Sequence, residues 1–180
     1  MKFKTTLITK HNFKKTFCLG LLFVNLITHA QTNIDSLILS GLQKAQNGNL
    51  DSALVDFNNS ITIKPTSKGY FYRGGIHTSQ KQFQKGIDDY SKAIQLDSNF
   101  AEAYAQRATN YMTYRKHYRG LRDINKAIKI EPNNGNLYYL RSAIKAILGD
   151  NIGACSDMKI AVKLGNKWGN KDLENACKKH

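Results

Sequence analysis

The sequence repeats one pattern of residues at intervals of 33 or 34 positions, and this period constrains the fold more than any other feature. An aromatic residue returns at Tyr70, Tyr104 and Tyr138. Three positions later comes Arg73, Arg107 or Arg141, and the next position is always small: Gly74, Ala108 or Ser142. Leu37 and Gly41 mark an earlier, more degenerate copy. Such a period indicates stacked repeats, each of which is one supersecondary unit.

The second half of each unit repeats as well. Two small positions recur, at Ala53, Gly86, Gly120, Ala154 and at Ser60, Ala93, Ala127, Ala161. A large apolar position lies between them, at Phe57, Tyr90, Ile124, Met158. Small residues at fixed places predict that two helices cross closely there, with the large side chains filling the space alongside. Pro65 and Pro132 close the first and third units.

These residues resemble the tetratricopeptide repeat (TPR) family, and the match runs from residue 34 to about 166. The resemblance implies an all-α fold, a right-handed α-solenoid of helix-turn-helix units with a C-terminal capping helix within 167–180. The expected repeats 1 to 4 are 34–66, 67–100, 101–134 and 135–166. In each unit we expect an A helix, near 34–47, 68–80, 101–114 or 135–148. A B helix should follow, near 50–63, 83–96, 117–130 or 151–164. Lys44 departs from the family pattern, which has an aromatic residue there, and Asn166 replaces the closing proline.

Charged residues form a second periodic series. Each B helix carries an aspartate just before its large apolar residue: Asp56, Asp89, Asp123 and Asp157. Together with the arginines on the A helices, they predict repeated Arg–Asp pairs between packed helices, because the planar guanidinium suits a carboxylate at a partly buried crossing. The spacing leaves open whether Arg73 meets Asp56 or Asp89. The alternative is that these arginines bind the phosphates or carboxylates of a ligand.

The first thirty residues have the pattern of a cleaved secretory signal peptide. Five lysines and no acid precede the apolar run 17–27, and Thr28 and Ala30 supply the small residues before a cleavage site at Gln31. A membrane anchor is the alternative, but the run is shorter than the roughly 20 residues that span a bilayer. The chain has 27 basic and 13 acidic residues, so cleavage would lower its formal net charge from +14 to +9.

Export would place the remaining cysteines, Cys155 and Cys177, in an oxidising compartment. They form an even pair without a CxxC motif, which predicts a disulfide between the last B helix and the capping helix. Two buried free thiols are the alternative.

The resemblance also implies a binding groove, because the A helices of TPR proteins line a concave channel. Carried over by repeat position, the expected partner-binding residues are apolar, aromatic or amide side chains: Leu39, Phe71, Tyr72, Gln106, Tyr139 and Leu140. Exposed apolar surface of this kind marks interaction sites. Chaperone-binding members grip a carboxylate with Lys and Asn, and the matching positions here hold Ile38 and Leu42, or Phe71 and Gly75.

The sequence favours a binding protein over an enzyme. It contains no phosphate-cradling Gly-rich loop, no HExxH and no GxSxG, so we expect no catalytic activity, cofactor or metal. A basic cluster spans 115–122, but an exported protein would not meet cellular nucleic acid. An anionic envelope surface or plain solvent is the expected neighbour of this cluster.

Taken together, these features predict a protein–protein interaction module of the bacterial cell envelope, periplasmic or secreted, that binds a peptide or partner protein in its groove. The chain resembles short exported TPR proteins of Bacteroidetes-type bacteria. The alternative function is a self-associating structural subunit whose groove is filled by another copy.

Overall fold

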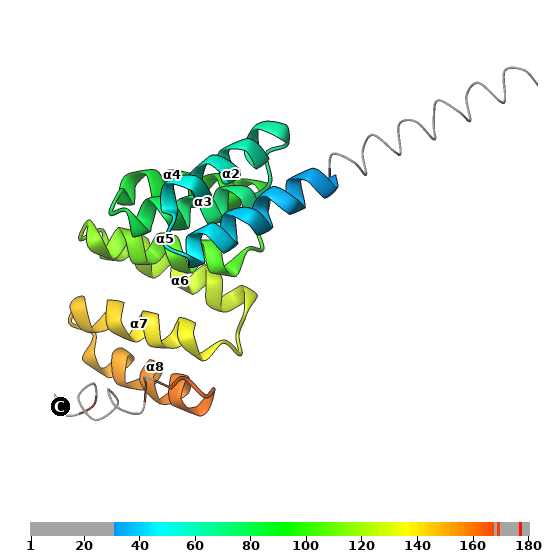
Figure 1. Ribbon diagram of the computed structural model, residues 1–180. Coiled ribbons are helices and arrows are strands. Elements are labelled where there is room, and N and C mark those ends of the chain that lie inside the picture. Colours follow the sequence, from blue (N-terminus) through cyan, green and yellow to red (C-terminus); the bar gives the residue numbers. More distant parts are fainter. Residues whose placement is uncertain (1–30, 168, 170–176, 178–180) are drawn as a thin grey trace, which may run out of the picture.

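A computed structural model describes residues 31–167, 169 and 177, and over this part the chain is all-α (Figure 1). Residues 31–46 are helical and precede α2 (Leu50–Ile63). Three further pairs follow: α3 (Ser67–Ser79) with α4 (Phe83–Leu96), α5 (Ala101–Thr113) with α6 (His117–Ile130), and α7 (Gly135–Ile147) with α8 (Asn151–Lys163). The described residues contain no strand. The predicted fold class is therefore confirmed, and the bounds of α2 to α8 agree with the expected ones within one residue.

The helix pairs stack in sequence order. Each A helix packs on the B helix of its own repeat (α3 on α4, α5 on α6, α7 on α8) and on the preceding B helix. Neighbouring A helices also touch, α3 with α5 and α5 with α7, whereas α4, α6 and α8 make no comparable contact with one another. Because the A helices approach one another more closely, they lie on the inner side of the stack.

The turn inside each repeat needs one residue in the left-handed backbone region. Repeats 1 and 4 supply glycine there, Gly48 with φ 81° and Gly149 with φ 84°. Repeats 2 and 3 use Lys81 with φ 61° and Arg115 with φ 55° instead. Glycine adopts this conformation without a steric penalty and a side-chain-bearing residue does not.

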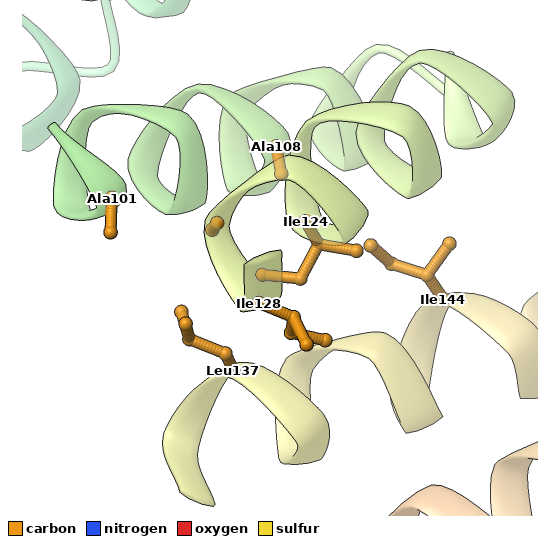
Figure 2. Packing of buried hydrophobic residues seen from close by; sticks show 7 residues of the cluster. Ala101, Ala108, Ile124, Ile128, Leu137 and Ile144 are labelled. Carbon is orange, nitrogen blue, oxygen red and sulfur yellow. The ribbon is translucent and has the colours of Figure 1, made fainter. Parts of the chain in front are cut away.

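The core is built from the recurring small and large positions. Phe57, Tyr90, Ile124 and Met158 are all buried, as are all eight small residues on the B helices. The two helices of a repeat approach closely at the small positions, since a Cβ on Gly86 would lie only 2.6 Å from Thr78 Oγ1. Figure 2 shows the next layer, in which Ile124 and Ile128 of α6 face Leu137 and Ile144 of α7. Each repeat thus buries its apolar surface against the next one.

Two sequence expectations lie outside the described residues: the signal peptide and nearly all of the capping helix. Of the latter, Gly169 is buried, and its N–H donates to Asn166 Oδ1 at 2.7 Å. No helix in the described part of the chain is long and apolar enough to cross a membrane.

Candidate functional site: the inner face and the charged junctions beneath it

Every arginine of the periodic series pairs with the aspartate of its own repeat. Arg107 Nε and Nη2 donate to the two carboxylate oxygens of Asp123 at 2.7 and 3.0 Å. Arg73 meets Asp89 in the same way at 2.9 and 2.6 Å, and Arg141 meets Asp157 at 2.8 and 2.7 Å. The question left open by spacing is therefore answered in favour of Asp89. Bidentate geometry of this kind is among the stronger side-chain interactions.

Each arginine also reaches the preceding repeat. Its Nη1 donates to a polar side chain on the previous B helix: Asn58, Ser91 or Asn125, at 2.8, 2.9 and 2.9 Å. One guanidinium thus joins three helices. Sequence reasoning missed these partners, although all three occupy the same repeat position, two residues after the aspartate, and this shared position was the available signal.

The recurring tyrosines pack against the arginines of these Arg–Asp pairs. Tyr70, Tyr104 and Tyr138 place their rings 5.3, 5.6 and 5.3 Å from the guanidinium carbon of the arginine that follows. A cation over an aromatic face is stabilised electrostatically. Each guanidinium therefore uses three of its five donors within the protein and has one face covered by a ring, which favours the structural role over ligand binding.

Repeat 1 holds its aspartate differently. Asp56 Oδ2 accepts from Lys44 Nζ and from Ser40 Oγ, both at 2.7 Å. Ser40 occupies the arginine position, and Lys44 the position that is aromatic in the family. Burial would raise the pKa of Asp56, but the hydrogen bonds from Lys44 and Ser40 outweigh it and hold that pKa below its ordinary value. Lys44 is thus the cation that pairs with Asp56 in repeat 1, and Lys145 at the same position of repeat 4 reaches Asp157 Oδ2 at 2.8 Å beside Arg141.

The predicted groove residues occupy two adjacent positions on the A helices and divide into exposed and packed side chains. Leu39 is 68% exposed, and Gln106 is exposed as well. Phe71, Tyr72, Tyr139 and Leu140 are half-buried. On the inner face, the exposed side chains of Leu39 and Gln106 are therefore accessible to a partner, and the other four are partly covered.

The two rings of repeat 2 are committed to neighbours. Tyr72 stacks on Phe57 with the ring centroids 5.8 Å apart, and Phe71 lies 4.7 Å from the Phe100 ring. Tyr72 packs against the core cluster of Ala53, Phe57 and Ile76, so replacing it with alanine should lower stability as well as remove groove surface. Leu39 and Gln106 are the better reporters of ligand contact.

Two further side-chain hydrogen bonds tie helices together, one between repeats 2 and 3 and one within repeat 4. Asn110, which is 1% exposed, donates from Nδ2 to Thr78 Oγ1 at 2.8 Å and so joins α3 to α5. Asn166 Nδ2 donates to Asn136 Oδ1 at 2.7 Å. Thr78 therefore belongs to the packing between α3 and α5, and Asn166 contributes a hydrogen bond where the family has proline.

A small crevice of about 330 Å³ opens beside the repeat 2 junction, lined by Arg73, His77, Lys85, Asp88 and Asp89. Burial lowers the pKa of His77 below its ordinary value, although Asp89, whose Oδ2 lies 3.7 Å from Nε2, opposes this shift. Asp89 already accepts both hydrogen bonds of Arg73, and Asp88 accepts one from Gln84. Both carboxylates of the crevice therefore already accept hydrogen bonds from neighbouring side chains. Within the described ranges, no three His, Cys, Asp or Glu side chains are grouped as metal ligands.

Cys155 and Cys177 are joined by a disulfide, with Cα atoms 4.9 Å apart. The bond ties α8 to the chain that follows it.

Comparison with known proteins identifies the repeat. PilF of Pseudomonas aeruginosa superposes with a TM-score of 0.78 at 14% identity, over 84% of this chain and 70% of that one. MamA superposes at 0.69 and 19% identity over 93% and 99% of the two chains. The first TPR of Spaghetti (RPAP3), bound to an HSP90 peptide, superposes at 0.60 and 20% identity over 62% and 90%.

No protein-family model matches the sequence. A curated relative, DnaJ homolog subfamily C member 7 of Mus musculus, is 36% identical over 58 residues. These residues are 32% of this chain and 11% of that protein, so the chain spans only a small part of its relative. The structure and these likenesses together define a tetratricopeptide-repeat fold.

Proposed function

We propose that this protein is an exported interaction scaffold of the bacterial cell envelope, which binds a peptide or a segment of a partner protein along its inner face. The observation that carries the proposal is the exposure of Leu39, at 68%, on the same side as the half-buried rings of Phe71, Tyr72 and Tyr139. Large rings that are already held in place offer contact area with little further loss of entropy, as in binding hot spots.

The kind of peptide follows from the side chains of the inner face. Ile38, Leu42, Phe71 and Gly75 stand where chaperone-binding TPR proteins carry the Lys and Asn that hold a terminal carboxylate. We therefore propose an apolar, internal segment as ligand and not an acidic peptide such as the HSP90 peptide bound by RPAP3. The exposed amide of Gln106 is available to hydrogen-bond the ligand backbone.

The export proposal rests on residues 1–30 and has its own test. We propose that the chain is exported and cleaved before Gln31, as expected for the short exported TPR proteins of Bacteroidetes-type bacteria that the sequence resembles. Intact mass of the protein from the envelope fraction should correspond to a chain beginning at Gln31. A retained Met1 or Lys2 would contradict this proposal and leave the binding proposal standing.

The binding proposal is tested by photo-crosslinking in the native envelope, with matched positions on the two sides of the stack. A benzophenone side chain at Leu39 or Gln106 should give one partner band. The same group at Val55 or Gln95 should not, because these exposed residues lie on the B helices α2 and α4. Equal crosslinking from both sides would contradict a dedicated inner-face site.

The crosslinks also address the second candidate function, self-association. If the crosslinked partner is another copy of this chain, and light scattering shows a dimer whose population rises with concentration, the structural-subunit alternative is correct. A monomer at all concentrations together with a different crosslinked protein supports the scaffold.

A further inference from the structure

Helix α6 carries an exposed row of basic side chains that take no part in the Arg–Asp pairs. Arg119, Arg122, Lys126 and Lys129 are all exposed, and we call them the basic face of α6. Their spacing of three, four and three residues places them on one side of the helix. They extend over about 15 Å of its axis, at 1.5 Å per residue.

No acid neutralises this row. Asp123, the acidic residue of α6, is 2% exposed and bound to Arg107. Within the described part of the chain, no ion pair involves a member of the basic face. Glu131 follows the end of the helix and accepts from Asn134.

The TPR fold does not require these charges. The matching positions of repeat 1 hold Ser52, Val55, Asn59 and Thr62. Those of repeat 4 hold Gly153, Ser156, Ile160 and Lys163. All four repeats fold into the same helix pair, so the row in repeat 3 is not explained by architecture.

Arg115 adds a conformational observation to the same surface. It occupies the left-handed turn position with φ 55°, where repeats 1 and 4 have glycine. An arginine there is less favourable for the backbone than glycine. Its exposed side chain adds a further cation in the turn just before the N-terminal end of α6.

Two exposed tyrosines lie at that same end. Tyr118 is 77% exposed and Tyr114 is 42% exposed. Tyr118 is four residues before Arg122 and therefore next to it on the helix surface. A ring with one polar tip beside cations is the combination enriched where proteins meet the headgroups of a bilayer.

We propose that the basic face of α6, with Arg115 and Tyr118, docks on an anionic phospholipid surface. α6 packs between α5 and α7, so only one side of it is free. Exposed cations spread along this side can contact several anionic headgroups at once. The proposal uses the envelope location proposed above but not the peptide-binding role, and it involves the opposite side of the stack.

Vesicle flotation tests the proposal, using the chain with the N-terminus found by intact mass. Vesicles with about 30% phosphatidylglycerol should bind at low salt, and pure phosphatidylcholine vesicles should not. A triple variant, Arg119→Gln, Arg122→Gln and Lys126→Gln, should bind about 100-fold more weakly, since each cation near the surface contributes roughly a factor of five. Raising the salt to about 0.5 M should release the parent protein.

A second triple variant with the same net charge controls for charge alone. Lys64→Gln, Lys68→Gln and Lys159→Gln change exposed lysines outside α6, and binding should be nearly unchanged. Arg115→Gly separates binding from stability, because it should weaken vesicle binding while making the turn more favourable and raising the melting temperature. Tyr118→Ala should give a smaller loss than the first triple.

Three results would overturn the proposal. One is equal binding to neutral vesicles, and another is an equal loss in both triple variants. The third is binding to a single-stranded RNA oligonucleotide at a salt concentration where the vesicles do not bind, which would assign the surface to nucleic acid instead.

Discussion

Repeats 1 and 3 hold the same buried aspartate with different cations. In repeat 3, Asp123 accepts both hydrogen bonds from Arg107, whose side chain is 14% exposed and also reaches Ser91 on the preceding B helix. In repeat 1, Asp56 accepts from Ser40 and from Lys44, whose side chain is 40% exposed. The aspartate is the constant partner and the cation is interchangeable.

The position of each repeat in the stack explains the difference. A guanidinium has five donors in a fixed fork, and in repeats 2 to 4 the preceding B helix supplies an acceptor for the donor that faces away from the aspartate. No repeat precedes residues 31–46 in the described chain. A lysine, with three donors on a flexible stem, pairs with one carboxylate without needing an acceptor on a preceding helix.

Removing the arginine of repeat 3 should have the largest effect. Arg107→Met would leave Asp123 buried at 2% exposure without its partner. Losing one member of a buried ion pair costs about 3–5 kcal/mol, so we expect a decrease of that size in the free energy of unfolding. Urea denaturation followed by circular dichroism measures it. A decrease below about 1 kcal/mol would contradict a structural role and favour the ligand-binding alternative for the arginines.

The disulfide should contribute somewhat less. Replacing Cys155 and Cys177 with serine opens a link across 22 residues, and loops of this size are stabilised by about 3 kcal/mol in the chain-entropy model. The variant tests whether the disulfide stabilises repeat 4 locally. We expect hydrogen exchange to rise in α7 and α8 and to remain unchanged in α3 and α4. Uniform acceleration along the chain would contradict this local effect.

Lys44→Met should cost less than about 1 kcal/mol, because the lysine is partly exposed and Ser40 still donates to Asp56. The effect should depend on pH. The folded pKa of Asp56 lies below its ordinary value of about 4, so the stabilisation is present above that pH and is lost as pH falls through the folded pKa. Denaturation at neutral and strongly acidic pH should therefore show a difference only at neutral pH. An equal loss at both would point to the packing of the lysine stem.

His77→Tyr, which installs the repeat 3 residue in repeat 2, should have the smallest effect. Burial lowers the folded pKa of His77, so the unfolded chain binds the proton more readily. Stability therefore falls as pH decreases through the ordinary value of about 6.5. The variant should lose part of the stability change between pH 7 and pH 5 that the parent protein shows. Identical slopes in thermal denaturation would contradict the involvement of His77.

The fold was accessible from the sequence because each of its requirements is met by residue type at fixed spacing. Close helix crossings need small side chains such as Ala53 and Gly86, and the large positions between them need apolar ones such as Phe57. These requirements recur at one period, so each copy reinforces the assignment made from the others. The charged series was accessible for the same reason.

Only the tertiary structure decided which residues pair with each arginine. Arg73 is 16 residues from Asp89 and 17 from Asp56, so sequence separation could not choose between them. The choice follows from how α3 packs on α4, which sets Nε and Nη2 opposite the carboxylate of Asp89. The same packing turns Nη1 toward Asn58 on α2.

The inner face shows the same division. Sequence position placed Tyr72 on the side of the A helices that faces the groove, and it could not tell an open side chain from a covered one. Contact between neighbouring A helices encloses Thr78 beneath Asn110, and the preceding B helix covers one side of Tyr72 with Phe57. The period determined by itself which residues lie on the A helices. Which of them water and a partner can reach was decided by packing between repeats, because that exposure depends on side chains about 15 to 32 residues away.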